Sequence, residues 1–285
     1  MTGPEPTYAG RVGYLATKHG KQAQIAPALA TVGLTVRSVA VDTDAFGTFS
    51  GDVPRRGSPL EVVERKARAA MAATGHEIGL ASEGSFGPHP GATWLTVDEE
   101  LVALVDDHLG LVLVEREVSL ETAAGATQVS PGDDLSRFCQ AVGFPAQALI
   151  VRPADGSHGP GTAKGITGEA ALARAVADAA RASADSRALV ETDLRAHLCP
   201  SRRPVIERAA ARLAARLGRR CPRCSSPGWG RLRSVPGLPC QSCGRPTEGA
   251  RAEVDGCARC DHSVERPVVA PGSCAPAAEC HWCNP

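Results

Sequence analysis

The chain has 285 residues, of which 43% are hydrophobic, and its 31 basic residues balance its 31 acidic residues. This length can bury a sizeable core, and the balanced charge excludes a global attraction to nucleic acid or to an anionic membrane. No apolar run approaches the roughly 20 residues of a membrane span, and the first residues do not resemble a signal peptide. We therefore expect a cytoplasmic protein without a membrane partner.

Short β-rich runs alternate with Ala-rich helical stretches through the first 200 residues, a pattern typical of α/β domains. Strands are predicted over 12–17, 35–41, 77–82, 110–120, 147–153 and 187–192. Helices are predicted over 20–33, 58–75, 132–143 and 168–183. We expect a flexible N-terminus at 1–10, followed over 11–200 by a mixed sheet that is flanked by helices and carries a cleft.

A further helix is predicted over 203–220, with Ile206, Ala210, Leu213 and Leu217 on one face. Its arginines lie on the other face, where solvation is the simplest interpretation. We assign 201–220 to a helix that connects the α/β domain to a second domain.

Cysteine dominates the segment 221–285, where four Cys-x-x-Cys pairs stand in a sequence with little apolar content. The pairs are Cys221 and Cys224, Cys240 and Cys243, Cys257 and Cys260, and Cys280 and Cys283. Two such pairs complete tetrahedral four-sulfur coordination, so this segment is predicted to be a zinc ribbon with two structural zinc ions. Sequential pairing closes the shortest loops, but the second and third pairs also suit one compact ribbon, with the outer pairs sharing the other ion.

The stretch "LATKHGKQAQIAPAL" ends a predicted strand in small and basic residues just before a helix. Such a turn brings backbone amides and a lysine to one point, an arrangement that binds phosphate oxygens. Thr17, His19 and Lys21 are therefore predicted to contact a phosphorylated ligand.

Two acidic segments follow. "SPLEVVERKARAA" carries Glu61 and Lys66 on a helix, and "LASEGSFGPHPG" ends a predicted strand at Glu83. Carboxylates beside a phosphate-binding turn supply hard ligands for Mg²⁺ and a base that orients water. These segments predict a magnesium-dependent phosphate-ester hydrolase.

"ATKHGK", "ExxxxKAR" and a strand ending in an acid and glycine together resemble the inosine/xanthosine triphosphate pyrophosphatase superfamily. The resemblance implies that Thr17 and Lys21 contact phosphate, that Glu61 and Glu83 hold magnesium, and that Lys66 neutralises developing charge. His19 stands where that superfamily has asparagine, and the resemblance covers about residues 11–90.

Over nearly its full length the chain is similar to an uncharacterised bacterial family, a domain of unknown function with a C-terminal zinc ribbon. The similarity lies in "ATKHGK", "SEGSFGPHP", "ETDxRAH" and the cysteine-rich tail. It implies no particular activity.

The segment "ETDLRAH" places Asp193, Arg195 and His197 on alternate residues after a strand. In an extended chain these side chains share one face, which could belong to an active site or to an ion-pair network. We include the three residues in the predicted catalytic set, at the far end of the substrate.

Two functions follow from these patterns. The first is a metal-dependent hydrolase acting on a nucleotide or another phosphorylated small molecule, which requires Lys21, Glu61, Glu83 and the 193–197 segment to converge. The second is a non-catalytic protein that binds nucleic acid or a protein partner through the zinc ribbon. Its candidate contacts are Arg223, Trp229, Arg231 and Arg233.

Overall fold

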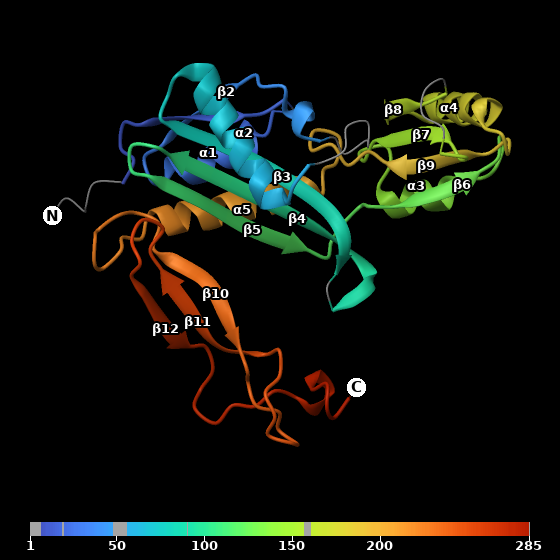
Figure 1. Cartoon of the computed structure of the whole chain (residues 1–285). Helices are drawn as coiled ribbons and strands as arrows, with labels where there is room; N and C mark the ends of the chain where they lie inside the picture. The colour runs from blue at the N-terminus through green and yellow to red at the C-terminus, as the bar shows by residue number, and fades with distance from the viewer. Residues whose placement is uncertain (1–6, 19, 48–55, 90, 157–160, 285) are drawn as a thin grey trace.

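A five-stranded mixed sheet forms the centre of the protein in the computed structural model, which describes residues 7–18, 20–47, 56–89, 91–156 and 161–284 (Figure 1). The strand order is β2-β1-β3-β4-β5. β1 runs parallel to β2 and β3, whereas β4 runs antiparallel to β3 and β5. The strands are β1 (Val12–Ala16), β2 (Thr35–Val39), β3 (Ile78–His89), β4 (Ala92–Asp106) and β5 (Leu111–Ser119).

Helices cover both faces of this sheet, which confirms the predicted mixed sheet flanked by helices. α1 (Gln22–Ala30) and α5 (Arg202–Leu217) pack on one face, over a core that includes Leu80, Val102 and Leu104. α2 (Pro59–Thr74) packs on the other face, over Ala81, Leu101 and Ala103. A short 3-10 helix, η1 (Thr43–Phe46), follows β2.

The longest strand, β4, was not predicted. Its apolar run Leu101–Val105 is preceded by Asp98, Glu99 and Glu100, and three consecutive acidic residues indicate a surface loop in sequence. The structure instead buries Asp98 and Glu100 completely. β3 also continues beyond its predicted end at Ser82, because it pairs with β4 as far as His89.

A smaller antiparallel sheet is inserted between β5 and α5 and forms a separate lobe in Figure 1. Its order is β6-β9-β7-β8, and its own core includes Leu149, Leu172, Val176 and Val190. Two helices, α3 and α4, supply part of that core. The elements are β6 (Ala126–Val129), α3 (Ser136–Val142), β7 (Leu149–Pro153), β8 (Ala163–Ile166), α4 (Glu169–Ala182) and β9 (Ala188–Thr192).

The helix predicted to connect two domains, α5, is a core helix of the central sheet. Its predicted apolar face is buried, as Ile206, Ala210, Leu213 and Leu217 are each at most 1% exposed. Three of the arginines on its other side form ion pairs with β5. Arg208 and Arg212 contact Glu117, and Arg216 contacts Glu115.

The C-terminal region contains a three-stranded antiparallel sheet that extends away from the central sheet in Figure 1. Its strands are β10 (Gly230–Pro236), β11 (Ala250–Gly256) and β12 (Ser263–Pro267), followed by the 3-10 helix η2 (Ala277–Glu279). Its near end is attached to the α/β domain, because Ala258 packs against the central core and Arg216 Nε donates a hydrogen bond to the Gly228 carbonyl over 3.1 Å.

Across the described part of the chain, none of the helices combines the length and the apolar character that crossing a bilayer requires.

Candidate functional sites

The eight cysteines of the Cys-x-x-Cys pairs gather into two sets of four. The first set is Cys221, Cys224, Cys257 and Cys260, and the second is Cys240, Cys243, Cys280 and Cys283. The eight cysteines predicted as ligands therefore lie in two four-cysteine clusters, each of which could hold a metal ion. The pairing is neither of the two that the sequence suggested, because the first pair joins the third and the second joins the fourth.

The antiparallel sheet explains this interleaved pairing. Cys-x-x-Cys pairs stand before β10, between β10 and β11, between β11 and β12, and after β12. Each strand carries the chain from one end of the sheet to the other, so successive pairs lie at opposite ends of the sheet. Gly230 at the start of β10 is in register with Gly256 at the end of β11, which brings the first pair beside the third. At the opposite end, Pro236 is in register with Ala250.

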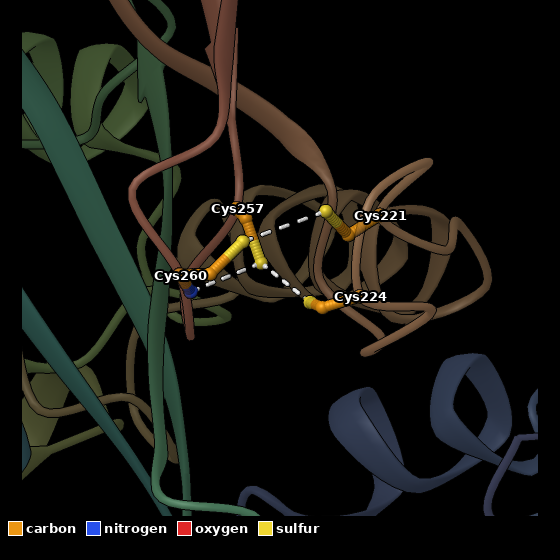
Figure 2. Close-up of side chains that lie close together, drawn as sticks. All are labelled: Cys221, Cys224, Cys257 and Cys260. Atoms are coloured by element: carbon orange, nitrogen blue, oxygen red, sulfur yellow. Dashed lines mark hydrogen bonds between the residues drawn. The ribbon is translucent and has the colours of Figure 1, made fainter.

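The sulfur positions suit zinc. Figure 2 shows the four side chains of the first set, which come from two loops and point toward one another. The Sγ–Sγ distances are 3.8 Å for Cys221–Cys260 and 3.6 Å for Cys224–Cys257. In the second set they are 3.8 Å for Cys240–Cys283 and 3.7 Å for Cys243–Cys280. Tetrahedral zinc with Zn–S bonds of about 2.3 Å separates its sulfurs by about 3.8 Å, so each set can hold one zinc ion.

Backbone amides support the thiolate form of these cysteines. The Ser242 amide donates to Cys240 Sγ over 3.4 Å, and the Arg259 amide donates to Cys257 Sγ over 3.3 Å. Amides of Cys243 and Ser242 directed at the sulfur lower the pKa of Cys240 to about 7. Zinc binds the thiolate form of cysteine, which hydrogen bonds from these amides stabilise.

A second candidate site lies where β3 continues past β1. The last pair in register between these strands is Ala16 and Ala81, so the residues of β3 after Ala81 lie beyond the end of β1. The chain turns from β1 into α1 beside them. Lys21 is at the start of α1, and its amide donates to the Thr17 hydroxyl over 3.3 Å. His19, the third predicted phosphate contact, lies outside the described residues.

Six charged side chains meet around this point, and we call them the charged cluster. Lys66 Nζ on α2 contacts Glu83 Oε2 on β3 at 2.5 Å. On the opposite face, Arg202 Nε on α5 contacts Glu100 Oε1 on β4 at 2.5 Å. The charges of all four side chains act on Lys21, and Asp98 interacts with Lys21, Glu100 and Arg202. The charged cluster comprises Lys21, Lys66, Glu83, Asp98, Glu100 and Arg202.

Burial changes the acidity of two members. Loss of solvation, followed by the charge of Arg202, lowers the pKa of Lys21 to about 8, although Glu100 and Glu83 oppose the change. Loss of solvation, followed by the charge of Glu100, raises the pKa of Asp98 to about 7. Both groups can therefore change protonation near neutral pH, which is characteristic of functional sites.

Gly84 makes room for the charged cluster. It is in register with Glu100 on the neighbouring strand. A Cβ atom at position 84 would overlap the Arg202 guanidinium and would lie 2.9 Å from both carboxylate oxygens of Glu100. The glycine of the "SEG" motif is therefore required inside a strand, and the strand does not end at Glu83 as predicted.

Glu61 lies apart from the charged cluster. It is exposed on the first turn of α2, where it completes a capping box with Ser58. Its Oε2 accepts a hydrogen bond from the Ser58 amide over 2.7 Å, and these bonds lower the pKa of Glu61. Glu83, by contrast, is 4% exposed and bonded to Lys66. The structure thus brings together Lys21, Lys66 and Glu83 from the predicted set, and it places Glu61 at a helix end.

The segment from Asp193 to His197 holds the inserted sheet to the start of α5. Asp193 is fully buried, and its Oδ2 accepts hydrogen bonds from Arg195 Nη2 at 2.5 Å and from the Gly165 amide at 3.1 Å. Burial and the charge of Arg195 lower the pKa of His197. Arg202 donates to the Leu194 carbonyl, so this segment begins beside the charged cluster.

Most of the candidate nucleic-acid contacts in the C-terminal sheet have partners. Arg223 pairs with Asp261, Arg231 pairs with Glu253, and the Trp229 ring stacks on His262 with centroids 5.3 Å apart. Arg233 is exposed on β10. A different aromatic side chain, Trp282 beside the second cysteine set, is 68% exposed, and the Arg245 guanidinium lies 4.2 Å from its ring centroid.

Sequence reasoning missed Asp98, Glu100 and Arg202. Arg202 was assigned to a helix start, and the acidic run was passed over. A hairpin signal was nevertheless present, because the apolar runs 101–105 and 111–114 are separated by the turn-like sequence "DDHLG". Extending the first strand of that hairpin toward its N-terminus would have placed Asp98 and Glu100 on one face of the strand.

Comparison with known protein families identifies one match. A family model described as a domain of unknown function, DUF6671, matches residues 66–285. No curated protein has a significant match to the chain. The matched region contains both cysteine sets and every member of the charged cluster except Lys21.

Proposed function

The chain belongs to the DUF6671 family, a domain of unknown function, and we propose that its α/β domain hydrolyses a phosphorylated small molecule such as a nucleotide. The observation that carries this proposal is the charged cluster. Three cations, Lys21, Lys66 and Arg202, meet two buried carboxylates, Glu83 and Glu100, where β3 passes the end of β1. Such a concentration of buried charge has a large desolvation cost, which favours a functional role over a purely structural one.

Lys21 and the first turn of α1 would bind the phosphate. The unpaired amides at a helix N-terminus and an adjacent lysine are suited to phosphate oxygens. The Thr17 hydroxyl lies at the same turn and holds it closed. Lys66 and Arg202 would balance the charge that develops on the phosphoryl oxygens during the reaction.

Glu83 would act on water. Its contact with Lys66 fixes the carboxylate on the α2 face of the sheet. In the proposed step, a water molecule transfers a proton to this carboxylate while the oxygen of the water forms a bond to phosphorus. The bond between phosphorus and the leaving oxygen breaks, and its electron pair stays with that oxygen.

The residues present do not fit the magnesium site predicted from Glu61 and Glu83. Glu61 caps α2, whereas Glu83 is bonded to Lys66. Among the described residues, the two cysteine sets are the groups in which three or more His, Cys, Asp or Glu ligand atoms gather within 4.8 Å. Magnesium therefore takes no part in the proposed step. We propose zinc for the cysteine sets, with a folding role, because four sulfur ligands leave no open position for a substrate.

The test is a hydrolysis assay of the zinc-loaded full chain. Standard and deaminated nucleoside triphosphates would be supplied with and without magnesium, and phosphate and pyrophosphate release would be measured. We expect Lys21→Gln and Glu83→Gln to reduce turnover at least 100-fold. Glu61→Gln is the matched control, because its carboxylate lies outside the charged cluster, and it should retain activity.

Two results would contradict the proposal. One is the absence of turnover with every nucleotide. The other is turnover that persists in both Lys21→Gln and Glu83→Gln while their circular dichroism and melting temperatures show that they are folded.

A second candidate function is supported by Trp282. This exposed ring, with Arg245 against it, offers a stacking surface and a positive charge beside the second cysteine set. Single-stranded nucleic acids bind surfaces of this kind. Fluorescence titration with single-stranded RNA and DNA tests this function, and Trp282→Ala should abolish binding while Trp229→Ala, which removes the stacked ring, should not.

A further inference from the structure

Within the part of the chain that the structure describes, the carboxyl group of Asp98 has no hydrogen-bonding partner. The residue is 0% exposed, and neither Oδ1 nor Oδ2 forms a hydrogen bond within the described structure. A buried ionised carboxylate without a partner is very unfavourable, whereas a protonated carboxyl is much less so. The surroundings of Asp98 therefore favour a bound proton.

Its nearest acidic neighbour strengthens this preference. Asp98 and Glu100 are two positions apart on β4, so their side chains leave the same face of the sheet. Glu100 Oε1 accepts a hydrogen bond from Arg202, while Oε2 has no hydrogen-bonding partner among the described residues. Arg202 is thus hydrogen-bonded to Glu100. The negative charge of Glu100 raises the pKa of Asp98.

Charged groups from each neighbouring element act on Asp98. They are Glu100 on β4, Arg202 and Arg208 on α5, and Lys21 on α1, and the thiol of Cys199 lies before α5. Burial and Glu100 favour the protonated form, and the three cations favour the ionised form. The result is a pKa of about 7, so the occupancy of the proton is sensitive to any added charge.

We propose that Asp98 takes up a proton when a phosphate-like dianion binds beside Lys21. This proposal rests on the proposed function, because it uses the same anion site. With Asp98 ionised, the charges of the cluster sum to zero, whereas with Asp98 protonated they sum to +1, which favours an anion. Binding of the dianion and binding of the proton therefore strengthen each other. As a result, Asp98 would increase the affinity for dianions at neutral and lower pH.

Sulfate is a suitable probe because it remains a dianion between pH 6 and 8. Calorimetric titration of the zinc-loaded full chain at pH 7.5, in buffers with different ionisation enthalpies, measures protons taken up per bound anion. We expect an uptake of about 0.5 to 0.8 proton in the wild type, since most Asp98 is ionised at that pH. Asp98→Asn should remove most of the uptake and leave at most about 0.2 proton, which Lys21 supplies because its pKa is about 8. The control Glu61→Gln should leave the uptake unchanged.

A measurement without ligand separates this proposal from the proposed function. Carbon-13 NMR of labelled aspartate, assigned by the signal missing from Asp98→Asn, gives the titration of Asp98 directly. Titration near pH 4, or sulfate binding with no proton uptake, would overturn the role of Asp98 alone. If Asp98 titrates near pH 7 and neither sulfate nor phosphate binds, the anion site itself is absent, and both proposals fail.

Discussion

Arg202 and Glu100 form an ion pair in the protein core, with 2.5 Å between Nε and Oε1 and 102 positions between them in the chain. The Arg202 side chain is 1% exposed and that of Glu100 is 0% exposed. This contact fixes the start of α5 against β4 and completes the charged cluster.

We predict that Arg202→Met destabilises the fold by about 3 to 5 kcal/mol, because it leaves Glu100 buried without its cation. The double variant Arg202→Met/Glu100→Met should be more stable than either single variant, since no unpaired charge remains. Urea unfolding of the four proteins gives the coupling energy. Additive losses in the double variant would show that the two residues do not depend on each other.

Gly84 should be intolerant of even one methyl group. Gly84→Ala places a Cβ against Arg202 and Glu100, and overpacking of this kind costs about 1 to 3 kcal/mol. Gly87 lies on the same strand and has no atom within 4 Å of the corresponding Cβ position. Gly87→Ala is therefore the control, and its melting temperature should stay close to that of the wild type. Equal losses in both variants would refute the steric explanation.

Asp98→Asn should stabilise the protein at pH 8 more than at pH 5. The folded-state pKa of Asp98 is about 7, against an ordinary value of 3.8. Between these values the unfolded chain has released the proton and the folded chain retains it, so stability falls as pH rises toward 7. The full pKa difference corresponds to about 4 kcal/mol, of which about 3 kcal/mol falls between pH 5 and pH 8, and asparagine removes this dependence.

Thermal unfolding of both proteins from pH 5 to pH 8 tests this prediction. A constant difference in melting temperature across the range would show that Asp98 is ionised in the folded state.

The two cysteine sets should differ in what they stabilise. Cys257→Ser and Cys280→Ser each remove one buried ligand, and each should lower zinc content from two ions to about one per chain. Cys257→Ser should also increase hydrogen exchange in β5 and α5, because Ala258 packs on the central core and Gly228 lies against Leu113.

Cys280→Ser should leave exchange in β5 and α5 unchanged, since its set lies at the far end of the C-terminal sheet. Mass spectrometry of zinc content and of hydrogen exchange provides both readouts. Identical exchange in the two variants would contradict the attachment of the near set to the α/β domain.

Local patterns predicted the elements that carry their own signal. The Cys-x-x-Cys spacing identified all eight cysteines of the two clusters, and helical periodicity identified the buried face of α5 with Ile206 and Leu213. Three members of the charged cluster were predicted as site residues because each stands at the end or on the face of a recognisable element. They are Lys21, Lys66 and Glu83.

The remaining features depend on pairing between distant segments, which a single sequence does not encode locally. Glu100 is an acidic residue that the fold buries against Arg202, 102 positions later in the chain, and Asp98 is buried two positions away on the same strand. Likewise, the ligand sets could not be assigned before the strands between the cysteine pairs were known, since those strands alternate the ends at which the pairs lie.

The interleaved cysteine pairs make the C-terminal region indivisible. Had the sites been sequential, one could have been deleted, duplicated or exchanged as a cassette without touching the other. Here, any chain break between Cys224 and Cys280 separates the ligands of at least one site, and a break between Cys243 and Cys257 separates both. Proteolysis, truncation or recombination within this stretch therefore removes more than the piece that is cut away, and neither site can be inherited as a continuous segment without half of the other.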